Sequence, residues 1–369
     1  MSESVTESVS EPVSEPVVED ATTASIERAG ALLAAGGMVA FPTETVYGLG
    51  ARIDRPDALS RIFSAKGRPT ADPLIVHVAE VADARALAAD WPEAADRLAE
   101  RWWPGPLTVV VPRRADLDDL VCAGGDTVGI RLPAHPVARS LVRAAGAPVA
   151  APSANRFGRI SPTTAAHVVA EFGGAADGPD LVLDGGPCPL GVESTVIDLT
   201  MSVPLVLRPG GLPVEDLRSV LGHVEVVDRA TTDDAVHRSP GEYLTHYAPR
   251  TPLVLLDAPP GTAKRLVAAL GGRGVDAATV VPGPGPGPGP VPVEQVAAGL
   301  YGWLRAGDEG PAVVLVAELV EPAGLGRAVN DRLFRAARGR LLGVPDPDDA
   351  AVDRLVDAVE RDLRGVGGP

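Results

Sequence analysis

Strand-like and helical patterns alternate along two separate stretches of this chain, and this alternation limits the folds available to it. From residue 23 to residue 227, short apolar runs typical of buried strands are separated by segments of helical period. The same order starts again at residue 251. We therefore predict an α/β fold: a first domain with a twisted mixed sheet, then a smaller three-layer domain with a parallel sheet.

The predicted elements follow from apolar period and from Gly and Pro breakers. Helices are expected at 23–35, 56–65, 82–89, 93–102, 136–145, 163–172, 263–270, 293–305, 327–338 and 349–363. Strands are expected at 38–41, 74–78, 107–111, 128–132, 148–151, 181–183, 194–199, 205–208, 254–256, 278–281 and 312–316.

Three segments fall outside this pattern. Residues 1–22 repeat Ser, Glu, Val and Pro without an aromatic residue, so we predict a disordered acidic tail. Residues 228–250 are polar and without period, and are predicted to form a linker. The run PGPGPGPGP at 282–290 predicts an expanded surface loop. The domains are then 23–227 and 251–369.

Composition bounds the class of protein. At 369 residues with 45% apolar content, the chain is long enough for two globular cores. No apolar run approaches the roughly 18 residues of a membrane span, and the acidic N-terminus does not resemble a signal peptide. Two cysteines far apart, Cys122 and Cys188, argue against a disulfide framework or a zinc site. We expect a cytoplasmic protein. The net charge of −16 argues against non-specific nucleic-acid coating.

Lys66 and Arg68 form a candidate anion clamp. Lysine is rare here, since only Lys66 and Lys264 occur among 33 basic residues. Lys66 precedes Arg68 in a loop held open by Gly67 and a proline. A lysine is a compact point charge, and an arginine is a planar fork; both suit phosphate or carboxylate oxygens. The alternative is a surface turn with two incidental charges.

Further polar clusters belong to the same domain. Arg131 lies on an apolar strand, where a charge needs a partner or an anion. Ser153 and Asn155 follow a strand end, where open α/β sheets bind ligands. The alternative for each cluster on its own is that its polar residues only stabilise a turn. Together with GVEST at 191–195 and with Arg208, they favour a site for a small polyanionic molecule.

These motifs carry a resemblance to a known family. FPTETVYGLG, KGRP, the Ser-x-Asn of APSAN, GVEST, LRPG and HYAP occur in the order typical of the two-domain threonylcarbamoyl-AMP synthases. The match runs from about residue 25 to about residue 250, and NDRLFRAA at 330–337 extends it more weakly. The resemblance implies a YrdC-like first domain and a Rossmann-like second domain. It also implies a nucleotidyltransferase that joins L-threonine, bicarbonate and ATP into threonylcarbamoyl-adenylate and pyrophosphate. Partner proteins then transfer the threonylcarbamoyl group to tRNA, which the enzyme itself contacts weakly or indirectly.

The resemblance also assigns roles to individual residues. Tyr247 of the linker is expected to close over the nucleotide, although Tyr243 is the alternative because Leu244 stands where relatives have another tyrosine. The catalytic set matches Lys66, Arg68, Ser153 and Asn155. The threonine-binding set matches Thr45, His77, Arg131, Ala151 and Ser194, and the ATP-binding set matches Arg68, Asp72, Thr127, Ser153, Ser161, Arg208 and Tyr247.

The reaction that the resemblance implies needs positioning and charge neutralisation rather than a covalent enzyme intermediate. Lys66 and Arg68 would screen the triphosphate and carbamate, and Arg131 would pair with the threonine carboxylate. Mg²⁺ would enter with ATP and bridge its phosphates, with no tightly bound prosthetic group and no protein metal site. For His77 we favour a hydrogen bond to the threonine hydroxyl over a role as base.

Two other classes of function remain. One is an RNA-binding module without turnover, which would show salt-dependent tRNA affinity. The other is a different transferase of the same fold that adenylates a carbamate made from carbamoyl phosphate. Such proteins carry acylphosphatase-like and zinc-finger segments, and neither is visible in this sequence.

Overall fold

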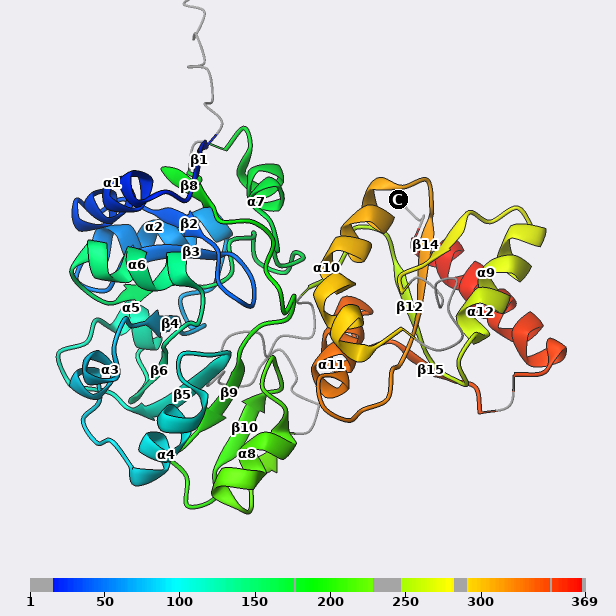
Figure 1. The fold of residues 1–369 in the computed structure, drawn as a ribbon. Coiled ribbons are helices and arrows are strands. Elements are labelled where there is room, and N and C mark those ends of the chain that lie inside the picture. The colour runs from blue at the N-terminus through cyan, green and yellow to red at the C-terminus, as the bar shows by residue number, and fades with distance from the viewer. Residues whose placement is uncertain (1–15, 176, 228–246, 282–290, 346, 367–369) are drawn as a thin grey trace, which may run out of the picture.

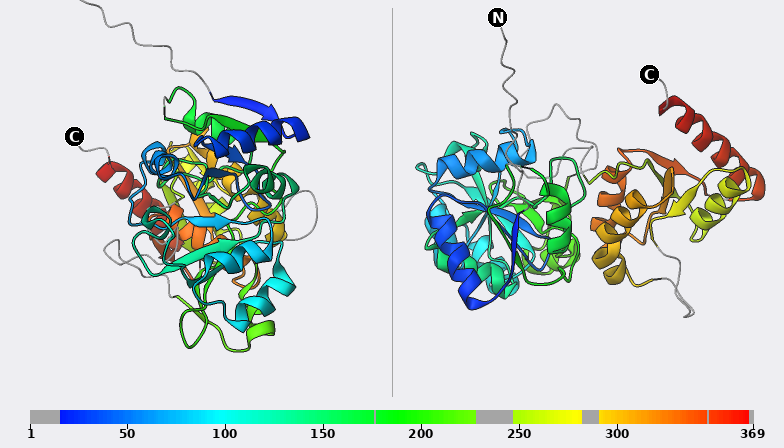
Figure 2. Two further views of the ribbon diagram at one scale, coloured as in Figure 1. Left: turned by 90° about the vertical axis from the view of Figure 1, so that its left-hand side faces the viewer. Right: turned by 90° about the horizontal axis from the view of Figure 1, so that it is seen from above.

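The computed structural model describes residues 16–366 except residues 176, 228–246, 282–290 and 346. Within these residues the chain forms two separate sheets with helices packed on them, and the two units lie side by side (Figures 1 and 2). The first sheet has eleven strands and the second has four. The predicted fold class, a mixed-sheet α/β domain followed by a smaller α/β domain, is confirmed.

The first sheet mixes parallel and antiparallel pairs. Its order is β1-β8-β2-β3-β7-β4-β6-β5-β9-β10-β11, with β4 parallel to β6 and β5 antiparallel to β6. The strands are β1 (Val17–Asp20), β2 (Val39–Phe41), β3 (Gly48–Arg52), β4 (Ile75–His77), β5 (Leu107–Pro112), β6 (Thr127–Arg131), β7 (Val149–Ala150), β8 (Leu181–Asp184), β9 (Thr195–Asp198), β10 (Leu205–Arg208) and β11 (Glu225–Val226).

Both faces of this sheet are covered, because successive residues of a strand point to opposite faces. In β2, Val39 and Phe41 pack in one apolar cluster with α1 and α6, whereas Ala40 packs in another with α2, α4, α7 and α8. The helices are α1 (Thr23–Ala34), α2 (Pro56–Lys66), α3 (Val81–Leu87), α4 (Glu93–Trp102), α5 (Asp119–Cys122), α6 (Pro136–Ala145), α7 (Ala165–Phe172) and α8 (Val214–Leu221).

Local signals at α2 place two of the predicted site residues. The helix begins with Pro56, whose fixed φ suits the first turn and whose missing N–H costs nothing there. It ends at Gly67, which adopts a left-handed conformation with φ of 60° that favours glycine. Lys66 therefore closes the helix, and Arg68 begins the following loop.

The second domain has a parallel sheet of order β13-β14-β12-β15. Helices α9 and α12 cover one face, and α10 and α11 cover the other, so it has the three predicted layers (Figure 1). Its elements are β12 (Leu253–Asp257), α9 (Thr262–Gly272), β13 (Ala277–Thr279), α10 (Val293–Glu309), β14 (Val314–Glu318), α11 (Gly326–Ala336), β15 (Leu341–Gly343) and α12 (Asp349–Val366).

The prediction of a disordered tail through residue 22 is wrong at its end. Residues 17–20 form strand β1, which pairs in parallel with β8 at the edge of the first sheet. The β-branched Val17 and Val18 suit an extended edge strand, although both are largely exposed. Residues 1–15 of the tail, residues 228–246 of the linker and the loop at 282–290 lie outside the described residues.

One apolar cluster joins the two domains. Val46, Ile160 and Val192 of the first domain pack with residues of α10 and α11, among them Leu300 and Val329. Figure 1 shows these two helices on the side of the second domain that faces the first. The ion pair between Arg305 and Glu171, 3.3 Å apart, crosses the same junction.

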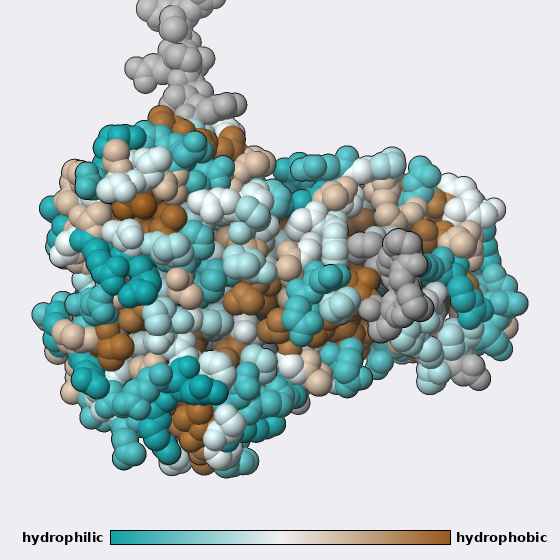
Figure 3. All heavy atoms as spheres, viewed as in Figure 1, coloured by the Kyte–Doolittle hydropathy of each residue, from teal (hydrophilic) through white to brown (hydrophobic). Residues whose placement is uncertain are grey.

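The face of the molecule shown in Figure 3 is predominantly polar. On the face shown in Figure 3, apolar residues form small patches separated by hydrophilic ones, with further apolar surface near the junction of the domains. Within the described residues, no helix is both long and apolar enough to span a bilayer.

Candidate active site

A pocket lies on one face of the first sheet. Ile75 and His77, two residues apart in β4, both contribute to it, because alternate residues of a strand share a face. The neighbouring strand β6 adds Arg131 and β10 adds Arg208. The lining residues are Thr43, Thr45, Val46, Gly48, Arg68, Ile75, His77, Arg131, Ala151, Pro152, Ser153, Glu193, Ser194, Arg208 and Tyr247.

All five residues assigned to threonine by the resemblance line this pocket. They come from five separate parts of the chain, which the sheet brings together. Of the ATP-assigned residues, Arg68, Ser153, Arg208 and Tyr247 line it too. Five of the residues assigned by the resemblance do not line the pocket as the described residues form it: Lys66, Asp72, Thr127, Asn155 and Ser161.

Arg131 forms an ion pair with a residue that the sequence did not single out. Its guanidinium lies 2.8 Å from the carboxylate of Glu44, and both side chains are buried. The contact lacks hydrogen-bond geometry, so buried polar atoms of both groups have no hydrogen-bond partner among the described residues. Arg131 lines the pocket and Glu44 does not, so the guanidinium is the member of this pair that a ligand carboxylate can reach.

His77 is a neutral imidazole in this fold. Burial, followed by the nearby charge of Arg131, lowers the pKa of His77 to about 3. Its Nδ1 lies 3.3 Å from the carbonyl oxygen of Ile75, and its ring meets Phe41 edge to face. A ring with so low a pKa is poorly suited to hold a proton taken from an ammonium group. The geometry agrees better with an orienting role.

The pKa of His77 makes stability depend on pH. We expect the free energy of unfolding to decrease as pH falls from about 6.5 towards 3, because the unfolded chain takes up a proton on His77 that the folded chain excludes. Denaturant unfolding of wild type and His77→Gln between pH 4 and pH 8 (roughly the window of this titration) measures the effect. The free energy of unfolding of His77→Gln should depend less steeply on pH than that of the wild type. Equal pH dependence in the two proteins would mean that folded His77 takes up a proton as readily as the unfolded chain does.

The Lys66 ammonium is buried and contacts backbone rather than open solvent. It donates hydrogen bonds to the carbonyl oxygens of Ser153, at 2.6 Å, and Asn155. Burial and then the charge of Arg68 hold the pKa of Lys66 well below its usual range. Lys66 thus ties the end of α2 to the segment that carries Ser153 into the pocket.

Arg68 and Asp72 form a buried pair beside the pocket. The Arg68 guanidinium lies 2.9 Å from the Asp72 carboxylate and donates to the carbonyl oxygens of Asp72 and Pro73. Thr127 opens β6 two residues before Gly129, the partner of Ile75 in β4. It therefore lies next to the loop that carries Arg68 and Asp72 rather than in the pocket wall.

Ser194 and Arg208 hold each other in place. Arg208 donates hydrogen bonds to the carbonyl oxygen of Ser194, at 3.0 and 3.2 Å, and to its hydroxyl at 3.2 Å. The Ser194 hydroxyl also lies 2.8 Å from that of Thr108. Burial lowers the pKa of Arg208 from its usual value. The GVEST and LRPG motifs therefore form one unit.

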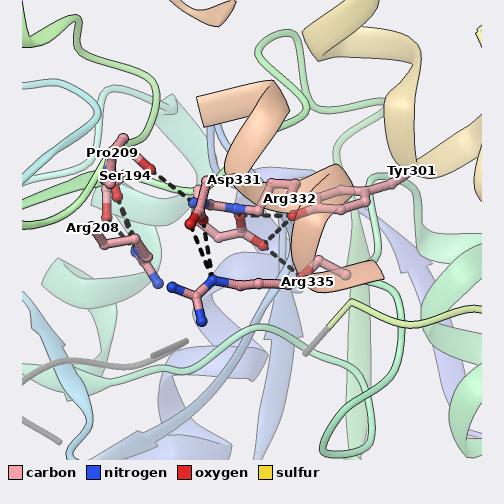
Figure 4. A network of polar contacts seen from close by, with 9 residues as sticks. Ser194, Arg208, Pro209, Tyr301, Asp331, Arg332 and Arg335 are labelled. Carbon is pink, nitrogen blue, oxygen red and sulfur yellow. Dashed lines mark hydrogen bonds and ion pairs between the residues drawn. The ribbon is translucent and has the colours of Figure 1, made fainter. Parts of the chain in front are cut away.

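The second domain reaches this unit, which the sequence did not predict. Figure 4 shows Tyr301 of α10 and Arg332 of α11 pointing towards the segment that carries Ser194 and Arg208. Both are fully buried and both contact the carboxylate of Glu193. The available signal was NDRLFRAA, which puts several charges on a helix with an apolar stripe. The second domain contains no phosphate-loop motif that would mark it as part of a ligand site.

Fold and pocket together define a class: a two-domain α/β protein with an arginine-rich pocket for a small anionic or zwitterionic ligand. Comparison with known proteins is more specific. A family model described as telomere recombination, covering Sua5, YciO and YrdC, matches residues 31–210. A second, described as the threonylcarbamoyl-AMP synthase C-terminal domain, matches residues 212–338. The chain belongs to the threonylcarbamoyl-AMP synthase family, with both of its domains.

Individual relatives agree over most of the chain. The threonylcarbamoyl-AMP synthase of Bacillus subtilis strain 168 is 42% identical over 328 residues, 86% of this chain and 94% of the relative. That of Pyrococcus abyssi is 41% identical over 320 residues, 84% and 93% of the two chains. The crystal structure of P. abyssi Sua5 complexed with L-threonine superposes with a TM-score of 0.82 at 39% identity, covering 89% of this chain and 99% of that one.

Proposed function

We propose that this chain condenses L-threonine, bicarbonate and ATP to L-threonylcarbamoyl-adenylate, releasing pyrophosphate and water. The product would serve partner proteins that transfer the threonylcarbamoyl group to tRNA. The observation that carries the proposal is one pocket, lined by all five residues matched to threonine and by four of the residues matched to ATP. Membership of the family supports the same reading.

The first chemical step is attack of the threonine amine on bicarbonate. The ammonium must first lose a proton to solvent. The nitrogen lone pair then forms the C–N bond, and a hydroxyl of bicarbonate leaves with a second N–H proton as water, giving a carbamate. Arg131 of the pocket wall would hold the threonine carboxylate, with Glu44 orienting its guanidinium from behind, and neutral His77 would contact the side-chain hydroxyl. Fixing both reactants in one pocket lowers the entropic part of the barrier.

In the second step a carbamate oxygen attacks the α-phosphorus, and the bond to the β-phosphate oxygen breaks to release pyrophosphate. Arg68 and Arg208, both buried and both in the pocket wall, would offset the charge on the phosphates. Water would destroy the carbamate, so closure of the pocket matters. Tyr247 is placed to contribute to that closure.

Mg²⁺ would enter as part of the nucleotide substrate. The pocket wall supplies arginines and hydroxyls, and its single acidic side chain, Glu193, is engaged by an arginine. Within the described residues, no three His, Cys, Asp or Glu side chains gather into a metal-binding group. Phosphate oxygens and water are therefore the ligands we propose for the ion.

The deciding experiment is incubation with ATP, bicarbonate and labelled threonine. We expect pyrophosphate release that depends on threonine, and a labelled adenylate recovered by rapid chromatography. Omission of bicarbonate is the control. Salt-dependent tRNA retention without pyrophosphate release would instead favour the RNA-binding alternative.

Threonine should be preferred over serine. The residues matched to the amino acid include apolar surface as well as hydroxyls, and the threonine methyl would add contact that serine lacks. One methyl group in an apolar pocket is worth roughly 1 to 3 kcal/mol, so we expect kcat/KM to differ by about 10 to 200-fold. Steady-state pyrophosphate release with each amino acid measures this. Equal use of both would contradict the substrate assignment.

A further inference from the structure

Residues 191–195 lie between the pocket and the second domain. Ser194 and Glu193 both line the pocket, and Glu193 also contacts α10 and α11. Gly191 approaches α10 so closely that an added Cβ would lie 2.4 Å from the carbonyl oxygen of Ala297. The segment thus has the pocket on one side and the C-terminal domain on the other.

The Glu193 carboxylate is held by three side chains, two of them from the C-terminal domain. The Ser161 hydroxyl donates to it at 2.6 Å. The Tyr301 hydroxyl lies 2.8 and 2.9 Å from its two oxygens, and Arg332 Nε donates at 2.7 Å. A buried carboxylate with this many charge-assisted contacts is fixed in position.

Arg332 links both motifs that flank the pocket. Besides Glu193, its guanidinium donates to Asp331 and, at 3.1 Å, to the carbonyl oxygen of Pro209. Pro209 directly follows Arg208. One side chain of the C-terminal domain therefore contacts the GVEST motif and the LRPG motif together (Figure 4).

The charges in this network depend on one another. Burial alone would raise the pKa of Glu193, but Arg332 and then Arg208 outweigh it, so the pKa is lowered and the carboxylate stays ionised. Removing the arginine would leave a buried, poorly compensated charge, which is strongly unfavourable.

The same two side chains hold Tyr247. Its ring stacks on that of Tyr301, with centroids 5.7 Å apart and planes 24° apart. The Arg332 guanidinium lies 5.0 Å from the centroid of the Tyr247 ring and makes a cation–π contact with it. Tyr247 is itself part of the pocket wall.

We propose that Arg332 and Tyr301 are positioning residues for the nucleotide half of the pocket. They fix Glu193, which in turn fixes Ser161, and they seat Tyr247 against the pocket. The C-terminal domain thereby completes the ATP site without touching the reacting atoms. This inference rests on the proposed function, because the nucleotide half is defined by the residues matched to ATP.

The test compares KM for ATP with KM for threonine in single variants of the full chain. Arg332→Met should raise KM for ATP about tenfold or more, and Tyr301→Phe, which keeps the ion pair, by about threefold to tenfold. KM for threonine should rise clearly less than KM for ATP in both. Of the residues matched to threonine, only Ser194 adjoins the network, whereas Ser161 and Tyr247 of the ATP set contact it directly. Equal rises in the two KM values, or none, would overturn the proposal.

A matched control lies on the same helix. Arg327 of α11 also reaches the first domain, 3.8 Å from Glu215, but this pair is partly exposed and longer. Exposed pairs contribute little, so Arg327→Gln should keep both KM values. A rise in KM for ATP equal to that of Arg332→Met would show that the effect is not specific to the buried network.

A double variant separates positioning from simple stability. Glu193→Gln combined with Arg332→Met removes both charges, so its Tm should recover relative to Arg332→Met alone. KM for ATP should stay raised, because Ser161 and Tyr247 have lost their fixed partners. Recovery of KM together with Tm would mean that Arg332 is only structural. If Arg332→Met does not fold, Tyr301→Phe decides the matter by the same KM comparison.

Direct ATP titration by calorimetry keeps the two proposals distinguishable. A wild-type chain that binds ATP but releases no pyrophosphate contradicts the proposed reaction, and the variants are then compared by Kd for ATP, with the same expected ratios. A wild-type chain that binds no ATP overturns both proposals.

Discussion

Lys66→Ala should reduce adenylate formation by a factor on the order of 10² to 10³ while leaving the protein folded. The structure gives the physical reason. The Lys66 ammonium is buried where it holds the carbonyl oxygens of Ser153 and Asn155, next to Arg68. Its loss removes the side chain that the resemblance matches to catalysis, and it releases the segment that brings Ser153 into the pocket. Threonine-dependent pyrophosphate release measures the loss.

The chain supplies its own control for this experiment. Lys264, the one other lysine in the sequence, is exposed on α9 of the second domain. Lys264→Ala should therefore turn over at the wild-type rate. Near wild-type turnover of Lys66→Ala would remove Lys66 from the site, and an altered circular dichroism spectrum would assign the loss to misfolding instead.

Gly191→Ala is expected to open the contact between the domains. Gly191 has φ of 70°, and an added Cβ would lie 2.4 Å from the Ala297 carbonyl oxygen and 2.6 Å from the Ala298 Cα atom. Backbone atoms of a helix cannot move aside as a flexible side chain can. The conformational cost and the overlap together suggest a loss of about 2 to 5 kcal/mol. Thermal unfolding and limited proteolysis between the domains measure it.

The matched control is a glycine on the facing helix. Gly302 of α10 has nothing within 4 Å of an added Cβ, and alanine favours a helix more than glycine does. Gly302→Ala should keep or slightly raise Tm. Should Gly191→Ala unfold at the wild-type temperature and resist proteolysis equally, the close approach of α10 to residue 191 would be incorrect.

Much of the fold could be predicted because strong local signals mark its elements. The helices Glu93–Trp102 and Pro136–Ala145 have the predicted bounds, since an amphipathic stripe and a proline or glycine at their ends define them. Strand β3 (Gly48–Arg52) and helix α8 (Val214–Leu221) were not predicted. The former contains two glycines and the latter is short, so neither has a clear period. Strand β1 was missed because its partner β8 is distant in sequence.

The site was predictable where a motif marks it and not where distant residues pair. Arg131 could be expected to need a partner, but nothing in the sequence points to Glu44. The contact between Glu193 and Arg332 joins two domains, so it depends on how these pack. Local patterns contain no information on such packing. The prediction therefore found the pocket wall but overlooked the side chains behind it.

The interface between the domains also decides which parts of this chain can be exchanged with a relative. A hybrid joined between residues 227 and 251 would take the residue at position 193 from one parent and the residue at position 332 from the other. Glu193 and Arg332 have to be inherited as a pair, with a small residue at position 191 to admit the helix. A crossover in the linker therefore preserves the domain interface only when both parents have glutamate at position 193, arginine at position 332 and glycine at position 191.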